Sequence, residues 1–280
     1  MAYLQCCFFA KSLMRTVDVT VILPTDKVVP GQSGYAPQKP LKTLYLLHGI
    51  FGSCYDWVNG TRIAAWAQNR DLAVVMPSAE NKFYVDNPRS GDNFGKFIGE
   101  DLVEFTRRSF PLSHAREDTF IGGLSMGGYG AIRNGLVYSD TFGAIVGLSS
   151  ALVLDNAAKS TYDNPTLLGS RHYYESIFGD LDALPGSDMD PYALIQKHLA
   201  AGKTLPKIYL ACGTEDTGIL PGNEAFHAFL SKNNVEHTYI TAPGTHNWTF
   251  WDTFIEKALD WLPLGDAAQG LSSGHISAED

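Results

Sequence analysis

The fold is decided by the stretch Thr119-Phe120-Ile121-Gly122-Gly123-Leu124-Ser125-Met126-Gly127-Gly128-Tyr129-Gly130. It begins as a short β-prone run and ends in small residues that open a helical pattern. A strand that turns directly into a helix brings the two backbones close together, and side chains at Gly123 and Gly127 would clash there. The pattern therefore predicts a sharp strand–turn–helix unit. It would expose the Ser125 hydroxyl above the sheet and leave the Met126 N–H without a partner inside the helix.

Composition limits the classes of partner. A chain of 280 residues, 45% hydrophobic and 18% charged, suits one large α/β domain or two small ones. The net charge of -9 argues against nucleic acid or an anionic membrane and favours small or neutral substrates. No apolar run reaches the ~20 residues that cross a bilayer, and the apolar N-terminus lacks a basic start, so we expect a strand there. Four cysteines without metal spacing predict free thiols in a reducing cytoplasm.

Strand-like and helix-like segments alternate along the chain. Residues 41–47 form a near-continuous apolar run, which is typical of a strand buried on both faces of a parallel sheet. We expect strands at 3–9, 16–23, 41–47, 72–76, 142–148, 207–212 and 237–241, and helices at 56–68, 97–110, from Ser125 to about 138, 223–230 and 248–261. The alternation predicts an α/β fold with a mostly parallel, doubly wound sheet and helices on both faces. Reactive groups would then lie at the carboxyl ends of strands.

Residues 151–201 interrupt this alternation. They are rich in Asp, Gly, Pro and Tyr, with short helical pieces at about 173–177 and 191–199. We expect a lid-like insertion over the carboxyl edge of the sheet, with an ordinary long connection as the alternative. The organisation predicted is one domain over 1–264 that includes this insertion, followed by a small, polar, flexible tail at 265–280.

Two later strand ends offer partners for Ser125. A serine hydroxyl is a poor nucleophile without a base beside it. The strand at 207–212 runs into Gly213-Thr214-Glu215-Asp216, and the strand at 237–241 runs into Ala242-Pro243-Gly244-Thr245-His246. We expect His246 to accept the Ser125 proton and Asp216 to orient the imidazole, with Glu215 as the alternative acid.

The run His48-Gly49-Ile50 ends the strand at 41–47. We expect the N–H groups of Ile50 and Met126 to form an oxyanion hole, and His48 to order the loop by hydrogen bonds. Five aromatic residues near strand ends are candidates for an acyl or aryl pocket, with core packing as the alternative for each: Phe51, Trp57, Tyr84, Tyr129 and Trp248.

Four motifs together carry a family resemblance: Leu46-Leu47-His48-Gly49, Gly122 to Ala131, Cys212-Gly213-Thr214-Glu215-Asp216 and Pro243-Gly244-Thr245-His246-Asn247-Trp248. They resemble the esterase D-like α/β-hydrolases, and within them bacterial tributyrin esterases and their feruloyl (cinnamoyl) and acetyl esterase relatives. The resemblance runs from the second strand to Trp261. It implies an α/β-hydrolase fold and a serine carboxylesterase that cleaves short-acyl or phenolic-acid esters through an acyl-enzyme. It also implies no metal or organic cofactor, and frequent oligomerisation, so a homo-oligomer is one expectation.

Two other functions stay open. S-formylglutathione hydrolases belong to the same broad group, but their usual cysteine close after the oxyanion loop is not matched in place, since Cys54 lies further on. A non-catalytic binding module on the same fold is the third hypothesis, and the complete set of Ser125, Asp216 and His246 argues against it. The family often has Asp directly after the catalytic histidine, where this chain has Asn247.

Overall fold

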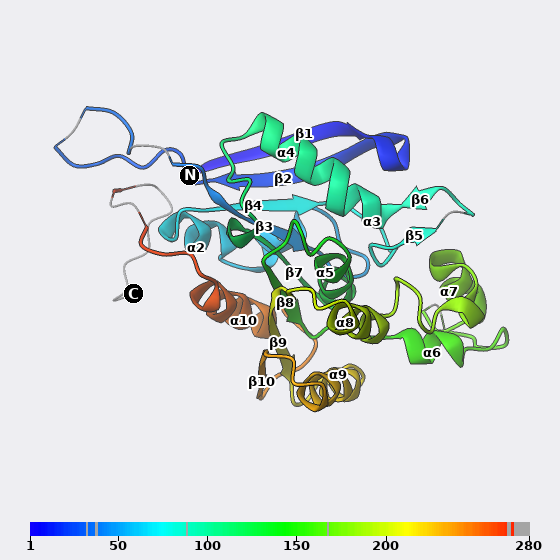
Figure 1. Ribbon diagram of the computed structural model, residues 1–280. Helices are drawn as coiled ribbons and strands as arrows, with labels where there is room; N and C mark the ends of the chain where they lie inside the picture. Colours follow the sequence, from blue (N-terminus) through cyan, green and yellow to red (C-terminus); the bar gives the residue numbers. More distant parts are fainter. Residues whose placement is uncertain (32, 37–38, 88, 167, 268–269, 272–280) are drawn as a thin grey trace.

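An eight-stranded sheet forms the centre of the molecule, with the strand order β1-β2-β4-β3-β7-β8-β9-β10. The computed structural model describes residues 1–31, 33–36, 39–87, 89–166, 168–267 and 270–271. Most of the segment 265–280, for which we expected a flexible tail, lies outside the described residues. Figure 1 shows the sheet running through the molecule from β1 to β10.

The strands are mostly parallel, as the alternation predicted. β1 pairs antiparallel with β2, and β2 with β4, whereas every later pairing is parallel. The strands are β1 (Ala2–Ala10), β2 (Arg15–Leu23), β3 (Lys42–Leu47), β4 (Leu72–Pro77), β7 (Thr119–Leu124), β8 (Ala144–Leu148), β9 (Lys207–Gly213) and β10 (Thr238–Ala242). The short strands β5 (Asp86–Asn87) and β6 (Asp92–Asn93) form a separate hairpin. The predicted α/β class with a mostly parallel sheet is confirmed.

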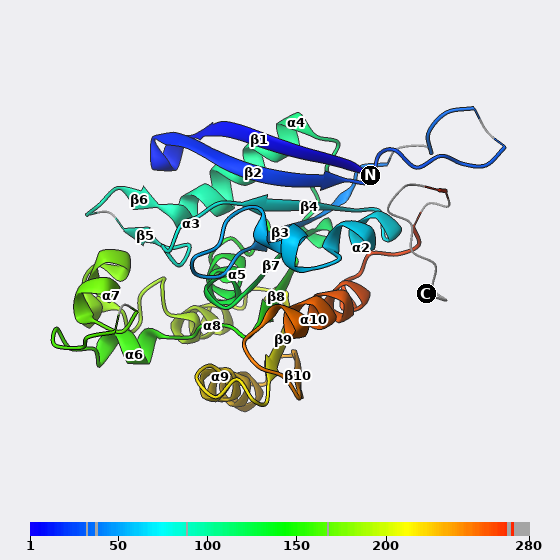
Figure 2. The same cartoon turned by 180° about the vertical axis from the view of Figure 1, so that it is seen from behind.

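Helices cover both faces of the sheet. They are α1 (Asp56–Gly60), α2 (Ile63–Asn69), α3 (Phe94–Lys96), α4 (Leu102–Ser109), α5 (Met126–Val137), α6 (Leu154–Ala158), α7 (Arg171–Phe178), α8 (Pro191–Ala200), α9 (Leu220–Lys232) and α10 (Trp248–Trp261). Buried residues of α4, α5, α8 and α9 share one core with the sheet, and those of α1, α2 and α10 share the other. Figures 1 and 2 show these two layers from opposite sides.

Two expected helices differ in the structure. The helix expected over 56–68 is broken into α1 and α2, because Thr61 is extended (φ -144°) and the Arg62 N–H donates to Asp252 of α10 at 2.9 Å. The helix expected over 97–110 begins as a π-helical segment at Phe97–Asp101 and continues as α4, which ends at Ser109. Hydrophobic spacing locates such helices but does not fix their boundaries, and here a hydrogen bond to α10 accompanies the break before α2.

The segment 151–201 contains α6, α7 and α8 and is fastened to α5. The Tyr129 hydroxyl donates to the Met189 carbonyl at 2.6 Å, and the buried Arg133 guanidinium forms an ion pair with Asp188. The Phe178 ring of α7 packs edge-on against Tyr129, with ring centroids 6.2 Å apart. These contacts attach the segment beside the helix that follows Ser125.

In the described part of the chain, no helix has the length and apolar character needed to cross a membrane. The apolar N-terminus forms β1, as expected. All four cysteines are free thiols, and Cys54 and Cys212 are buried.

Candidate active site

Ser125 occupies a strained turn between β7 and α5. Its backbone has φ 53° and ψ -119°, a region that non-glycine residues rarely adopt. The Ser125 N–H donates to the Leu148 carbonyl at 2.9 Å, which fixes the turn to β8. A Cβ atom at Gly127 would lie 2.6 Å from the His48 carbonyl oxygen and closer still to that of Leu47. Only glycine therefore allows α5 to start this close to the end of β3.

Ser125, His246 and Asp216 form a continuous hydrogen-bonded chain. His246 Nε2 lies 2.9 Å from Ser125 Oγ, and His246 Nδ1 lies 2.6 Å from Asp216 Oδ2. A carboxylate only accepts, so Nδ1 carries the proton and Nε2 is free to accept the Ser125 hydroxyl hydrogen. Asp216 is buried, with 5% of its surface exposed, whereas the alternative acid Glu215 is exposed, and the contact to His246 is made by Asp216. Side chains separated by 121 and 30 positions in the chain thus meet at one sheet edge.

The loops that carry the acid and the histidine are tied to each other. Thr214 N–H donates to the Ala242 carbonyl at 2.9 Å, and Glu215 N–H donates to the Gly244 carbonyl at 3.0 Å. Asn247, directly after the histidine, accepts a hydrogen bond from the Phe250 N–H at 3.1 Å and caps α10. Asn and Asp serve equally well at a helix N-cap, so Asn247 fills a structural position that an aspartate would also fill.

Trp251 on α10 supports the imidazole from behind. Its ring stands perpendicular to that of His246 (89°), with centroids 4.9 Å apart. The Trp251 indole N–H donates to Ser149 Oγ at 3.3 Å. The sequence does not predict either contact, because Trp251 on an amphipathic helix gives the same pattern as ordinary core packing.

The candidate oxyanion donors are the N–H groups of Ile50, in the loop after β3, and of Met126, directly after Ser125. Met126 is the first residue of α5, where a helix leaves N–H groups without internal partners. Among the described residues, neither the Met126 N–H nor the Ile50 N–H donates a hydrogen bond. The neighbouring Phe51 N–H, in contrast, is occupied by Asn81 Oδ1 at 2.7 Å.

His48 orders the loop that contains Ile50. Its Nε2 accepts from the Ala79 N–H at 2.9 Å, so Nδ1 carries the proton and donates to the Gly49 carbonyl at 2.6 Å. Burial lowers the pKa of His48, and the hydrogen bond to Gly49 opposes this only in part. The ring is therefore a neutral structural element whose two nitrogens fix two segments of backbone.

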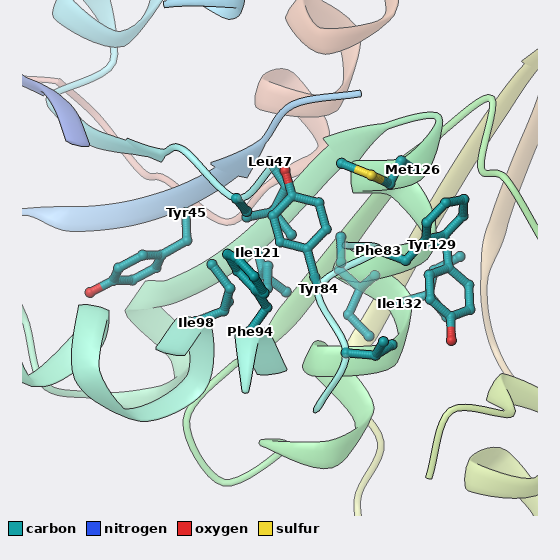
Figure 3. Packing of buried hydrophobic residues seen from close by; sticks show 14 of the residues in the cluster. Tyr45, Leu47, Phe83, Tyr84, Phe94, Ile98, Ile121, Met126, Tyr129 and Ile132 are labelled. Atoms are coloured by element: carbon teal, nitrogen blue, oxygen red, sulfur yellow. The ribbon is translucent and has the colours of Figure 1, made fainter. Parts of the chain in front are cut away.

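Three of the five candidate pocket aromatics are buried, and each donates a hydrogen bond to a backbone carbonyl near the site or in the 151–201 segment. The Trp57 indole donates to the Leu47 carbonyl at 3.0 Å, and the Tyr84 hydroxyl donates to the His48 carbonyl at 2.9 Å. Tyr129 reaches the 151–201 segment, as described above. Figure 3 shows Tyr84 beside Leu47, with Phe83 and Tyr129 in the same packed layer. In this conformation at most 1% of the surface of each of these three residues is exposed, which leaves almost none for contact with a substrate.

The other two candidates are exposed to different extents. Phe51 has 67% of its surface exposed and lies directly after Ile50. Trp248 is half-buried and packs perpendicular to Trp57, with ring centroids 5.6 Å apart. Phe51 and Trp248 stay predicted substrate contacts. Within the described ranges, no group of three or more His, Cys, Asp or Glu side chains is arranged to hold a metal ion.

Comparison with known proteins gives a consistent set of relatives. The Esterase family model, described as "Putative esterase", matches residues 10–262. An acetyl esterase of Caldicellulosiruptor saccharolyticus is 42% identical over 262 residues, which cover 94% of this chain and 98% of that protein. A substrate-bound fluorophosphonate-binding serine hydrolase of Staphylococcus aureus superposes with a TM-score of 0.82 at 32% identity, covering 95% of this chain and 99% of that chain. An S-formylglutathione hydrolase of the same organism gives a TM-score of 0.79 at 32% identity, covering 93% and 98%.

Proposed function

We propose that this chain hydrolyses short-acyl esters, and acetyl esters above all. The chain belongs to the Esterase family and is a serine carboxylesterase. The family and the esterase activity expected from the sequence motifs are confirmed by these relatives. The preference for acetyl groups is supported by the 42% identical acetyl esterase. The observation that carries the mechanism is the hydrogen-bonded chain from Asp216 through His246 to Ser125.

In the proposed mechanism Ser125 Oγ attacks the ester carbonyl carbon while its proton moves to His246 Nε2. The tetrahedral intermediate collapses, the bond to the leaving alcohol breaks, and the alcohol takes the proton from His246. A water molecule then attacks the acyl-enzyme with the same histidine as base, which releases the acid and restores Ser125. Asp216 stabilises the imidazolium in both halves.

We assign the oxyanion hole to the N–H groups of Ile50 and Met126. Support comes from the lack of any hydrogen bond from either group within the described residues, at positions next to the nucleophile. Removing one donor from such a site typically costs ~3 kcal/mol in the activation barrier. In this proposal Phe51 and Trp248 contact the substrate, while Trp57, Tyr84 and Tyr129 support the walls.

The proposal also covers the role of the 151–201 segment, the cofactors and partners of the enzyme, and its location. The segment 151–201 acts as a lid within a single domain over 1–264, supported by its attachment beside α5. The enzyme uses no metal or organic cofactor and has no nucleic-acid or membrane partner. The free thiols suit the cytoplasm. The chain assembles with copies of itself through β1, an edge strand without charged side chains.

The test compares variants on p-nitrophenyl acetate. Ser125→Ala removes the nucleophile, so we expect kcat to fall by at least ~10⁴-fold while the far-UV spectrum stays native. Asp216→Asn favours the wrong imidazole tautomer and should cost ~10⁴-fold. Glu215→Gln alters the adjacent exposed carboxylate and serves as the matched control with unchanged rate. Retention of a large part of the rate in Ser125→Ala would remove the assignment.

A substrate panel then addresses specificity. Esters from acetate to decanoate, together with methyl ferulate, should give the highest kcat/KM for acetate. A preference for methyl ferulate or for long chains would overturn the acetyl assignment while leaving the esterase mechanism intact.

A thioesterase acting on S-formylglutathione is the second candidate, favoured by the 32% identical Staphylococcus aureus hydrolase. Against it, Cys54 is buried, and its N–H is held by Ser78 Oγ at 3.0 Å. Rates on S-formylglutathione and on a butyrate ester decide between the two. Failure of the intact protein to react with a fluorophosphonate probe would instead favour a non-catalytic binding module.

A further inference from the structure

We propose that Asn81 is a positioning residue that fixes the oxyanion-binding N–H of Ile50. The inference rests on the function proposed above and concerns a residue outside the triad, the oxyanion hole and the pocket. Asn81 lies in the loop that follows β4, about thirty positions from Ile50, and its carboxamide reaches across to the peptide that links Ile50 to Phe51.

The oxyanion loop is tied to the loop after β4 along its whole length. Four hydrogen bonds join residues 48–54 to residues 78–84: Ala79 N–H to His48 Nε2 (2.9 Å), Tyr84 hydroxyl to His48 O (2.9 Å), Phe51 N–H to Asn81 Oδ1 (2.7 Å) and Cys54 N–H to Ser78 Oγ (3.0 Å). The bond to Asn81 is the shortest and the one nearest to Ile50. The acceptor is the amide oxygen, because the partner is an N–H group.

The backbone at this point needs external support. Phe51 has φ 66°, a left-handed conformation that is costly for a side chain of this size, and Phe51 is largely exposed, so burial of its ring does not offset the strain. The hydrogen bond to Asn81 holds the Ile50–Phe51 peptide plane in this orientation. Without it, that plane is free to rotate. The Ile50 N–H lies in the preceding Gly49–Ile50 peptide, which is joined to this plane at the Ile50 Cα, so the Ile50 N–H loses its restraint from that side.

The supporting loop is itself strained and well anchored. Glu80, Phe83 and Tyr84 all have positive φ (51°, 52° and 58°), and the Phe83 and Tyr84 side chains are buried. Strained backbone persists only where packing over-determines it, and it concentrates at functional sites. Buried aromatics therefore provide a rigid base from which Asn81 can hold a strained partner.

An asparagine suits this position on electrostatic grounds. A carboxylate would accept the same Phe51 N–H but would place a negative charge close to the developing oxyanion. A neutral carboxamide accepts the bond without that repulsion. Since a donor misplaced by ~1 Å can cost ~10²-fold in rate, loss of this one contact is large enough to measure.

The experiment measures kcat, KM and the Ki of phenylboronic acid, whose adduct with a serine is tetrahedral and anionic. For Asn81→Ala we expect kcat to fall ~10- to 100-fold, Ki to rise in parallel, and KM to change by less than ~3-fold. Asn233→Ala is the matched control. Asn233 Oδ1 accepts from Gln196 Nε2 at 2.9 Å at the end of α9, on the edge of the sheet opposite Ser125.

Each outcome decides the proposal. An unchanged kcat, or a fall in kcat without a rise in Ki, overturns it. So does a loss of thermal stability alone, which would make Asn81 a purely structural residue. If Asn81→Ala does not fold, Asn81→Leu, which keeps the volume but lacks the acceptor, takes its place, and failure of both to fold also overturns the proposal. Failure of the esterase mechanism itself would appear separately, as retained activity in Ser125→Ala.

Discussion

At the scale of single residues, the site depends on backbone conformations that the side chains do not favour. Ser125 and Phe51 both have positive φ, and they lie on the two loops that flank the proposed oxyanion hole. Each is held by neighbours: Ser125 by β8 and α5, and Phe51 by Asn81. The strain at Ser125 raises a hydroxyl above the end of β7, so stability and function oppose each other at this position.

The strain at Ser125 can be measured by substitution. Glycine adopts φ 53° and ψ -119° far more readily than alanine does, although it also loses more entropy on folding. We expect Ser125→Gly to have a free energy of unfolding ~1 kcal/mol higher than Ser125→Ala, with both variants inactive. Denaturant unfolding of the two variants checks this. Equal stabilities would show that the turn is relaxed.

His48 gives the site a defined pH dependence of stability. Burial lowers its pKa below the ordinary value of 6.5, so the unfolded chain takes up a proton that the folded chain resists. The folded state therefore keeps its full stability with respect to His48 above about pH 6.5 and loses free energy of unfolding as the pH falls below that value. We expect the midpoint of thermal unfolding to fall on acidification from about pH 7.5 to about pH 5.5, and to fall less steeply in His48→Gln. The exposed His114→Gln is the control and should keep the slope of the unaltered protein.

At the scale of elements, β7 and α5 can approach each other and β3 closely because glycines leave the space of a side chain empty at the points of contact. Gly123 and Gly127 lie where a Cβ would meet backbone atoms of the opposite segment or of β3, which cannot move aside. Tyr129 and Arg133 of α5 also donate hydrogen bonds to backbone carbonyls of the 151–201 segment. One helix therefore carries the nucleophile, presents the Met126 N–H and anchors the proposed lid.

A glycine pair tests this packing. Gly127→Ala places a Cβ 2.6 Å from the His48 carbonyl oxygen, so we expect a loss of ~3 kcal/mol or more in unfolding free energy. Gly218→Ala is the matched control, because nothing lies within 4 Å of its Cβ position. Solubility and chemical denaturation of the two variants give the readout. A Gly127→Ala variant as stable as the control would contradict the close approach of α5 and β3.

At the scale of the whole molecule, the two ends of the sheet differ. The parallel half collects the strand ends at which Ser125, Asp216 and His246 meet. The antiparallel end stops at β1, a nine-residue edge strand without a single charged side chain. Natural edge strands are usually protected by lysine, proline or a bulge. In the proposed assembly, exposed Tyr3 and Phe9 mark this edge as the surface for a second copy, which would pair antiparallel without like-charge repulsion.

The proposed assembly is tested by mass in solution. Light scattering after size exclusion should give a dimer for the unaltered chain and a monomer for Phe9→Lys, which introduces a charge where 60% of the side chain is exposed. Tyr35→Lys alters an exposed aromatic outside β1, in the loop that follows β2, and should stay dimeric. Ester hydrolysis confirms that each variant is folded. A monomeric unaltered chain at tens of micromolar would disprove the interface.

The sequence alone determined the class of fold and predicted Ser125 and His246 as the nucleophile and its base. Apolar runs marked the central strands, and the glycines around Ser125 marked a turn that no other residue permits. Local pattern is sufficient there, because a Cβ clash or a buried strand acts on its own neighbours in the chain. The family and the esterase activity followed from four such motifs.

Only the tertiary structure decided how these pieces contact one another. Asp216 rather than Glu215 reaches His246, Trp57, Tyr84 and Tyr129 are buried behind the site, and Asn81 and Trp251 support it without any signal in the sequence. The breaks between α1 and α2, and the π-helical start of α4, were equally absent from the hydrophobic spacing. The physical reason is the same for the side-chain contacts and for the break between α1 and α2: each depends on a hydrogen bond or ring contact between separate segments, and such contacts exist only after the sheet has brought those segments together.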